Sequence, residues 1–204
     1  MPDFTATKDH RGRILAGLAA ALERLSLAEL YTDDIAREAS VSKRTFYEHF
    51  ANKEACFLAL YKENSARILA VLRTAVVLPE LPMLERINRG TEAYLAVMQS
   101  QAPLMKRLYI DILKLGDEGM QAKRHVVQQF ADLLIGLYEE ERQRLPGMPV
   151  LKPELVLGVI AGLNELILFK IEDGEAGQLM ELVETSRLMI LGSIQGMLLQ
   201  SSGN

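Results

Sequence analysis

The chain has 204 residues, of which 49% are apolar, and a formal net charge of −4. This acidic balance argues against a protein that coats nucleic acid with its whole surface, and an aromatic content of 6% without tryptophan argues against a stacking platform for single strands. A single cysteine, scattered histidines and the absence of a signal or spanning segment predict a cytoplasmic protein without a disulfide, metal site, cofactor or membrane span.

Apolar residues recur at three- and four-residue spacing along nearly the whole chain, whereas the alternation typical of strands is hard to find. We therefore expect an all-α fold of about nine helices. Thr32, Ser42 and Asn52 are expected to cap helices, and prolines and glycines to end them. The predicted helices span residues 8–24, 33–39, 43–49, 52–78, 83–101, 103–115, 118–145, 153–172 and 176–200.

Three of these helices lie within the first fifty residues, and a tight turn from Ala39 to Ser42 joins the second to the third, which is typical of a helix-turn-helix unit. A small core is expected against Leu18 and Leu22, formed by Ile35, Ala36, Ala39, Val41, Phe46 and Phe50. The outward residues of the third helix are hydrogen-bond donors suited to base edges and phosphates, namely Lys43, Arg44, Thr45, Tyr47 and His49.

Residues 32–54, TDDIAREASVSKRTFYEHFANKE, resemble the DNA-binding signature of the TetR family, and the resemblance covers about the first sixty residues. It implies a helix-turn-helix DNA-binding domain over residues 1–52 and a helical ligand-binding and dimerisation domain over residues 53–204. It also implies a homodimer whose two recognition helices enter successive major grooves of a pseudo-palindromic operator. The DNA contacts expected on this basis are Thr32, Ser42, Lys43, Arg44, Thr45, Tyr47, His49 and Lys53.

Two residues depart from the family pattern, because glycine is frequent where Ser40 and Arg44 stand. Glycine adopts a left-handed turn most easily, so Ser40 bears on the geometry of the turn. Arg44 is expected to supply a base contact that sets the specificity of this protein. Lys53 is expected at a helix N-terminus, where free amides and the helix dipole attract a phosphate.

The middle helices carry flexible apolar side chains and a few polar groups without catalytic spacing, so we expect a ligand chamber rather than an active site. Residue by residue, an ordinary core is the simpler interpretation, and His125 is a further possible polar contact. The candidate ligand-binding residues are Met98, Met105, Leu108, Tyr109, Leu113, Met120, Phe130, Tyr138 and Asn164.

The last two helices are apolar over a broad arc and carry glycine pairs four residues apart, Gly158 with Gly162 and Gly192 with Gly196. An internal helix crossing would use such small residues equally well, but the surplus apolar surface favours a four-helix dimer interface. The candidate dimerisation residues are Leu155, Val159, Gly162, Leu163, Leu166, Leu182, Met189, Ile190 and Met197.

Together these features predict a transcription regulator, a repressor that a small, mainly apolar ligand releases from a double-stranded DNA operator. A transcriptional activator and a ligand-binding helical protein without DNA binding remain alternatives. An enzyme is the least favoured alternative, since no nucleophile set, phosphate loop or zinc motif is visible.

Overall fold

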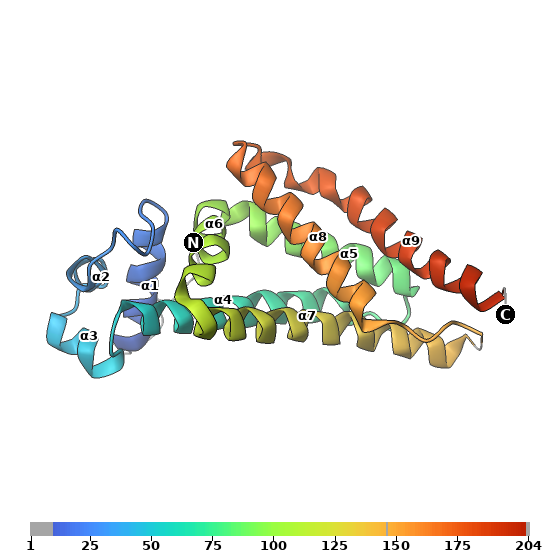
Figure 1. Ribbon diagram of the computed structural model, residues 1–204, viewed down its shortest axis with the longest axis horizontal. Coiled ribbons are helices and arrows are strands. Elements are labelled where there is room, and N and C mark those ends of the chain that lie inside the picture. Colours follow the sequence, from blue (N-terminus) through green and yellow to red (C-terminus); the bar gives the residue numbers. More distant parts are fainter. Residues whose placement is uncertain (1–9, 146, 203–204) are drawn as a thin grey trace. The chain divides into compact units, whose positions relative to one another are not determined.

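The computed structural model describes residues 10–145 and 147–202, and within them it is all-helical and without strands, as predicted (Figure 1). The described residues form nine α-helices and two short 3-10 helices, η1 (Ile112–Leu115) and η2 (Ala176–Glu181). None of these helices is long and apolar enough to cross a membrane. The α-helices are α1 (His10–Leu22), α2 (Thr32–Glu38), α3 (Lys43–His49), α4 (Lys53–Val76), α5 (Met83–Ser100), α6 (Ala102–Asp111), α7 (Gly116–Arg144), α8 (Pro153–Glu172) and α9 (Leu182–Ser202).

Two of the three predicted helix caps are confirmed. The Ser42 hydroxyl oxygen accepts a hydrogen bond from the Thr45 N–H at 3.0 Å, and the Asn52 amide oxygen accepts one from the Ala55 N–H at 2.7 Å. The Thr32 cap was wrong, because α2 begins one residue earlier than predicted and Tyr31 is its N-cap. There the Asp34 carboxylate reaches back to the Tyr31 N–H at 3.0 Å, as the third residue of a helix often does.

Other boundaries differ for local reasons. The predicted break near residue 116 is present, but Gly116 itself turns the chain with a φ of 60° and α7 starts there rather than at residue 118. The segment predicted as the start of the last helix forms η2 before α9 begins. The predicted start of the first helix at residue 8 lies outside the described residues.

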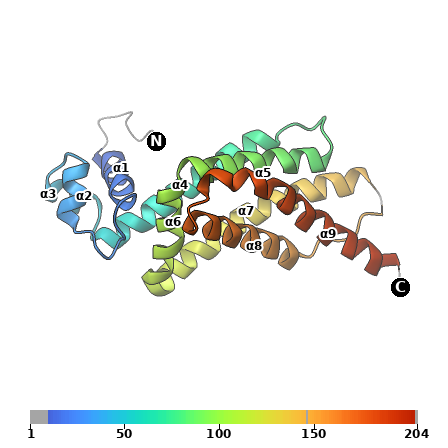
Figure 2. The same cartoon turned by 90° about the horizontal axis from the view of Figure 1, so that it is seen from above.

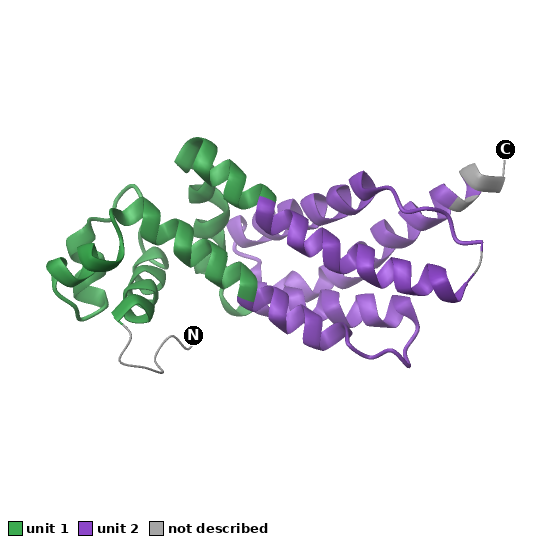
Figure 3. Cartoon of the chain, turned by 90° about the horizontal axis from the view of Figure 1, so that it is seen from below, with its two compact units in different colours: residues 1–66, 100–124 green, residues 67–99, 125–204 purple. Residues whose placement is uncertain are grey.

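The chain forms two compact units, coloured separately in Figure 3. Unit 1 contains the described residues up to Ala66 together with Ser100–Arg124, and unit 2 contains residues 67–99 and those from 125 onward. Helix α6 thus packs against α1, and the start of α7 belongs to the same unit, although both are distant from α1 in sequence. The predicted functional division at residue 52 therefore does not coincide with the compact units and remains a prediction.

The core of unit 1 is the one expected from the apolar spacing. Helix α1 is buried along one side, and Ile35 and Phe46 bring α2 and α3 against this core with fully buried side chains. Phe46 and Phe50 pack ring to ring at 5.9 Å between centroids. Ala36, Ala39 and Phe50 are also buried as predicted, whereas Val41 in the turn is only half-buried.

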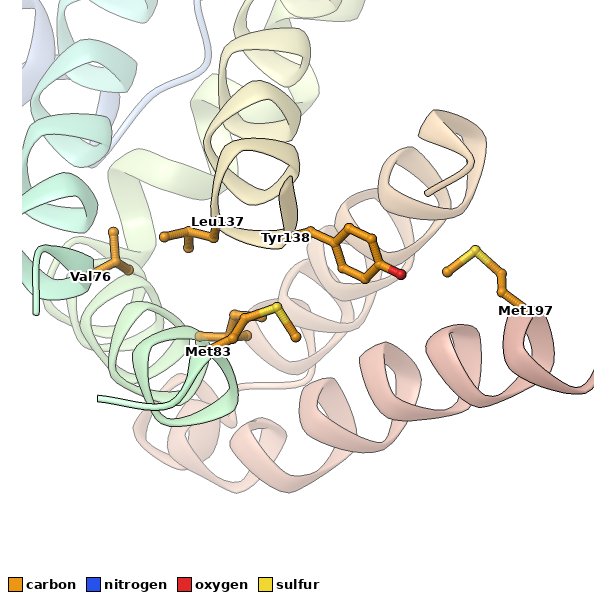
Figure 4. Packing of buried hydrophobic residues seen from close by; sticks show 6 residues of the cluster. Val76, Met83, Leu137, Tyr138 and Met197 are labelled. Carbon is orange, nitrogen blue, oxygen red and sulfur yellow. The ribbon is translucent and has the colours of Figure 1, made fainter. Parts of the chain in front are cut away.

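Unit 2 has a separate apolar core, in which side chains from α4, α5, α7 and α9 converge (Figure 4). At its edge the buried Arg86 guanidinium donates to the Val76 carbonyl at 2.8 Å, where α4 ends, and to the Glu140 carboxylate of α7 at 2.8 Å. These bonds satisfy a charge that would be costly to bury alone. The buried members of this core are Val76, Met83, Ile87, Leu137, Tyr138 and Met197.

Candidate functional site

The turn between α2 and α3 adopts the left-handed conformation at Ser40, although serine stands there in place of glycine. Ser40 lies in the left-handed region with a φ of 51°. Its N–H donates to the Arg37 carbonyl at 3.0 Å, and the Val41 N–H donates to the Ala36 carbonyl at 2.9 Å, which together form a Schellman C-cap. Serine thus occupies the position where glycine is preferred, at a conformational cost of about 1–2 kcal/mol.

Arg13 of α1 supports this turn from the other side. Its guanidinium donates to the carbonyl oxygens of Ala39 and Ser40 at 2.9 and 2.5 Å. Ala39 is the C-cap of α2 and Ser40 follows it, so a charged donor satisfies two carbonyls that the helix itself leaves open. The segment that leads into α3 is therefore held both by the turn's own hydrogen bonds and by Arg13 of α1.

The exposed face of α3 presents three of the predicted DNA contacts together. The Arg44 side chain is 89% exposed, Lys43 precedes it, and Tyr47 follows one helical turn later at 50% exposure. The Tyr47 ring packs edge-on against the buried Phe46 ring at 5.5 Å between centroids, and half of the residue remains exposed. This combination of a planar guanidinium, an ammonium and a phenol matches the groups that contact bases and phosphates.

Both cations on this face are paired within the unit. The Lys43 ammonium lies 2.9 Å from the Asp33 carboxylate, and this hydrogen bond raises the pKa of Lys43. The Arg44 guanidinium lies 3.1 Å from the Glu48 carboxylate one turn along the helix. Exposed pairs of this kind contribute at most about 1 kcal/mol, so both cations can exchange a carboxylate for a phosphate or a base at small cost.

The remaining predicted contacts on α2 and α3 lie around this face. Thr32 is the half-buried first residue of α2. The hydroxyls of Ser42 and Thr45 lie 2.8 Å apart at the start of α3. His49 at its end is exposed, and its ring meets that of His10 edge-on at 6.2 Å between centroids.

Lys53 is the first residue of α4, in agreement with its predicted place at a helix N-terminus. Its ammonium donates to the carbonyl oxygens of Leu27, Ala28 and Leu30 at 2.8, 3.3 and 2.7 Å. An ammonium group has three protons, and these bonds engage all of them. In this conformation Lys53 holds the connection between α1 and α2 and has no N–H left for a phosphate.

The predicted ligand-binding residues are divided between the two units. Among those in unit 1, Met105 accepts a hydrogen bond from the buried Asn64 amide at 3.3 Å, while Leu113 and Met120 are about half exposed at 47% and 50%. Leu108 is buried in this unit and Tyr109 is half-buried. Unit 2 contains Met98, Phe130, Tyr138 and Asn164, and the exposed His125.

Within unit 2 some of these residues do come together. The buried Tyr94, which the sequence interpretation missed, donates its hydroxyl to the Asn164 amide oxygen at 2.7 Å and packs against the Phe130 ring at 5.9 Å. Tyr138 lies apart from this group in the apolar core shown in Figure 4. Its hydroxyl donates to the Pro149 carbonyl at 2.8 Å, and burial raises its pKa.

Unit 2 also contains an apolar cavity of about 50 Å³ between α5, α7, α8, α9 and the segment before α8. The Ser193 hydroxyl on its wall donates to the Met189 carbonyl at 2.8 Å, so its proton is engaged. Tyr138 alone of the predicted ligand-binding residues lines this cavity, and three predicted dimerisation residues, Leu155, Val159 and Ile190, line it as well. The other lining residues are Ile87, Leu134, Leu151, Val156 and Ile194.

Helices α8 and α9 lie side by side (Figures 1 and 2), and several predicted dimerisation residues face the interior of the unit. A Cβ added at Gly162 would meet the Met189 side chain at 2.9 Å, so this glycine serves the crossing of α8 with α9. Leu163, Leu182 and Met197 are also buried, whereas Leu166 is half-buried. The interior of the single chain therefore accounts for much of the apolar excess seen in the sequence.

A different set of apolar and small residues remains exposed on the same two helices. Phe169 of α8 is 52% exposed, and Leu188 and Leu199 of α9 are 57% and 76% exposed. Around a Cβ added at Gly158, Gly192 or Gly196, nothing lies within 4 Å. We define these residues as the outer stripe: Gly158, Phe169, Leu188, Gly192, Gly196 and Leu199.

Side chains that suit metal or thiol chemistry are not assembled in residues 10–145 and 147–202, where no group of three or more His, Cys, Asp or Glu is placed to hold an ion. Cys56 is fully buried, and burial raises the pKa of its thiol to about 12. The thiol therefore stays protonated near neutral pH, and the thiolate is the reactive form.

The sequence interpretation missed Arg13 and Asp111. Arg13 acts through a contact with residues far along the chain, which periodicity does not reveal. Asp111 is completely buried on α6, and the signal for it was visible as a lone carboxylate inside an otherwise apolar stretch. An isolated acid at a core position usually has a specific partner.

Comparisons with known proteins agree with the sequence resemblance. The family model of bacterial regulatory proteins of the tetR family matches residues 14–60. The HTH-type transcriptional regulator EthR of Mycolicibacterium smegmatis is 30% identical over 136 residues, which cover 67% of this chain and 62% of EthR. The match thus spans less than two thirds of the length of that relative.

Solved structures of similar fold include FadR of Bacillus halodurans, a fatty acid degradation regulator, with a TM-score of 0.79, 16% identity and coverage of 91% of this chain and 96% of that chain. FadR of Bacillus subtilis, solved with stearoyl-CoA, has a TM-score of 0.76 and 17% identity, covering 87% and 96% of the two chains. These identities are low, so the likeness establishes the fold.

Proposed function

Because this chain belongs to the TetR family of bacterial regulatory proteins, we propose that it is a repressor that binds a pseudo-palindromic operator as a homodimer. The observation that carries this proposal is the exposed face of α3, where Lys43, Arg44 and Tyr47 project from a helix held by Arg13 and the Ser40 turn. A rigidly held recognition helix is what base readout in a major groove requires.

We place the dimer interface on the outer stripe. Exposed large apolar side chains beside glycines with open space let a second copy approach closely. Two copies packed through α8 and α9 would form a four-helix interface, the arrangement that the sequence predicted, with Leu188 and Phe169 in place of the residues that face inward.

The cavity in unit 2 supports a small apolar effector. Its lining is almost entirely hydrocarbon, and the protons of both its hydroxyl groups are engaged by main-chain carbonyls. The fold can hold an acyl chain, since FadR of Bacillus subtilis was solved with stearoyl-CoA. At about 50 Å³, however, this cavity is smaller than typical ligand pockets of roughly 300–1,000 Å³, so a longer ligand has to move its walls apart.

The proposed coupling follows from that movement. Helix α4 runs without interruption from Lys53, four residues after the end of α3, to Val76 in the core that adjoins the cavity walls. A ligand that spreads the walls acts on the far end of this helix. The two half-sites of an operator are spaced by roughly 34 Å. A modest change in the separation of the two helix-turn-helix units of the dimer, here called its heads, therefore prevents them from contacting both half-sites at once.

The test of DNA binding is selection of genomic fragments by the purified protein, compared with an Arg44→Ala, Tyr47→Ala double variant. We expect a pseudo-palindrome to be recovered with the native protein and lost with the variant, because a bidentate arginine contact contributes about 1–3 kcal/mol per head. A Lys62→Ala variant, which removes an exposed charge from α4, is the control. Failure of the native protein to enrich any sequence at low salt would favour the alternative without DNA binding.

The effector proposal is tested with fatty acids of increasing chain length. We expect them to raise the melting temperature and to weaken operator binding, and a Val159→Phe substitution that fills the cavity to abolish both effects. Val77→Phe, at a 66% exposed position outside the cavity, should respond like the native protein. If fatty acids stabilise Val159→Phe as strongly as the native protein, they bind elsewhere.

A further inference from the structure

The connection between α1 and α2, residues 23–31, is held at one residue by two other helices. The Leu27 N–H donates to the Asp111 carboxylate of α6 at 2.9 Å, and the Leu27 carbonyl accepts from the Lys53 ammonium of α4 at 2.8 Å. The Leu27 and Leu30 side chains are buried at 5% and 1% exposure. We call Leu27 with Asp111 and Lys53 the Leu27 junction, and all three residues lie in unit 1.

Asp111 brings a negative charge to this junction, although the hydrogen bond from the Leu27 N–H needs only an acceptor oxygen. Asp111 has no exposed surface, and its second oxygen accepts from the Lys114 ammonium at 2.7 Å. Burying a carboxylate is costly unless each oxygen is paired, whereas a neutral amide oxygen would satisfy the Leu27 N–H. The charge makes the contact strong and directional between segments 84 residues apart in sequence.

Lys53 also binds the connection between α1 and α2 at residues other than Leu27. Its other two hydrogen bonds reach the carbonyls of Ala28 and Leu30, so α4 holds three residues of the connection shortly before α2 begins. Helix α2 leads through the Ser40 turn into α3, and Arg13 ties that turn back to α1. A displacement of the connection between α1 and α2 would therefore move α2, the Ser40 turn and the recognition helix α3 together.

We infer that Asp111 and Lys53 are positioning residues for DNA binding, which set the orientation of α2 and α3 through the Leu27 junction. Lys53 then contributes to operator affinity without touching a phosphate, and α6 acts on the recognition helix through Asp111. The inference rests on the proposed function, since it concerns how the same operator is bound. The salt dependence of binding distinguishes the two possible roles of Lys53, because each phosphate contact releases counterions.

The test measures operator affinity over a series of salt concentrations for Lys53→Met, with Lys62→Met as the matched control on the same helix. We expect Lys53→Met to lower the affinity about tenfold while the slope of log affinity against log salt stays that of the native protein. A slope reduced by about one per head would identify a phosphate contact and overturn the inference. An unchanged affinity would overturn it as well.

Asp111 is tested by a pair of substitutions. Asp111→Leu leaves the Leu27 N–H without an acceptor and should lower operator affinity about tenfold, whereas Asp111→Asn retains an acceptor oxygen and should restore most of it. Circular dichroism well below each melting temperature checks that the variants are folded, and Asp117→Asn on α7 is the control. Equal affinities for Asp111→Leu and Asp111→Asn in folded proteins would refute the role of this bond. Absence of any operator for the native protein would instead refute the proposed function.

Discussion

Replacement of Gly17 by alanine is expected to lower the free energy of unfolding by about 1–3 kcal/mol and to abolish tight operator binding. A Cβ at this position of α1 would lie 2.7 Å from the Ala39 nitrogen, 2.9 Å from its Cβ and 3.0 Å from its Cα. Two of these three atoms belong to the backbone, so no side-chain rotation relieves the clash. Helix α2 would have to move away from α1 and would take the Ser40 turn and the recognition helix with it.

Gly136→Ala is the matched control for this substitution. Gly136 is also a helical glycine, in α7, but nothing lies within 4 Å of its added Cβ. Here alanine is expected to be neutral or to stabilise by up to about 1 kcal/mol, because it favours the helix over glycine. Urea unfolding followed by circular dichroism measures both, and similar stabilities for the two variants would mean that α1 and α2 are not in close contact.

Substitution of Leu188 by glutamate is expected to produce a monomer and to weaken operator binding by a factor of about 10²–10⁴. Leu188 is 57% exposed in the outer stripe, where a second copy would bury it. A buried unpaired carboxylate opposes association, and the two-fold symmetry of the interface introduces two of them. A monomer reaches only one half-site at a time and loses the effective concentration that links the two heads.

Val71→Glu provides the comparison, since Val71 is a 45% exposed apolar residue of α4 outside the outer stripe. It should leave the oligomeric state unchanged. Sedimentation equilibrium gives the mass of each variant, and anisotropy with a labelled operator gives its affinity. A dimeric Leu188→Glu variant would show that the two copies associate through another face, and a monomeric variant with undiminished affinity would show that one head is enough.

Much of this architecture could be predicted from short-range patterns in the sequence. The helices, the Ser42 and Asn52 caps and the shared face of Lys43, Arg44 and Tyr47 follow from residues within one or two turns of each other. Helical periodicity determines which neighbours face the same way, and a cap depends on a side chain and an amide three residues apart. The continuous signature around α2 and α3 identified the family for the same reason.

Only the tertiary structure decided the roles that depend on distant partners. Lys53 and Asp111 meet at Leu27 across 26 and 84 residues, and no local pattern distinguishes a lysine that holds carbonyls from one that awaits a phosphate. Leu163 and Leu188 are the same residue type in neighbouring helices, yet the first is buried within the chain and the second is exposed. Apolar spacing marks a surface that must be covered, whereas packing alone determines whether the same chain, a ligand or a second copy covers it.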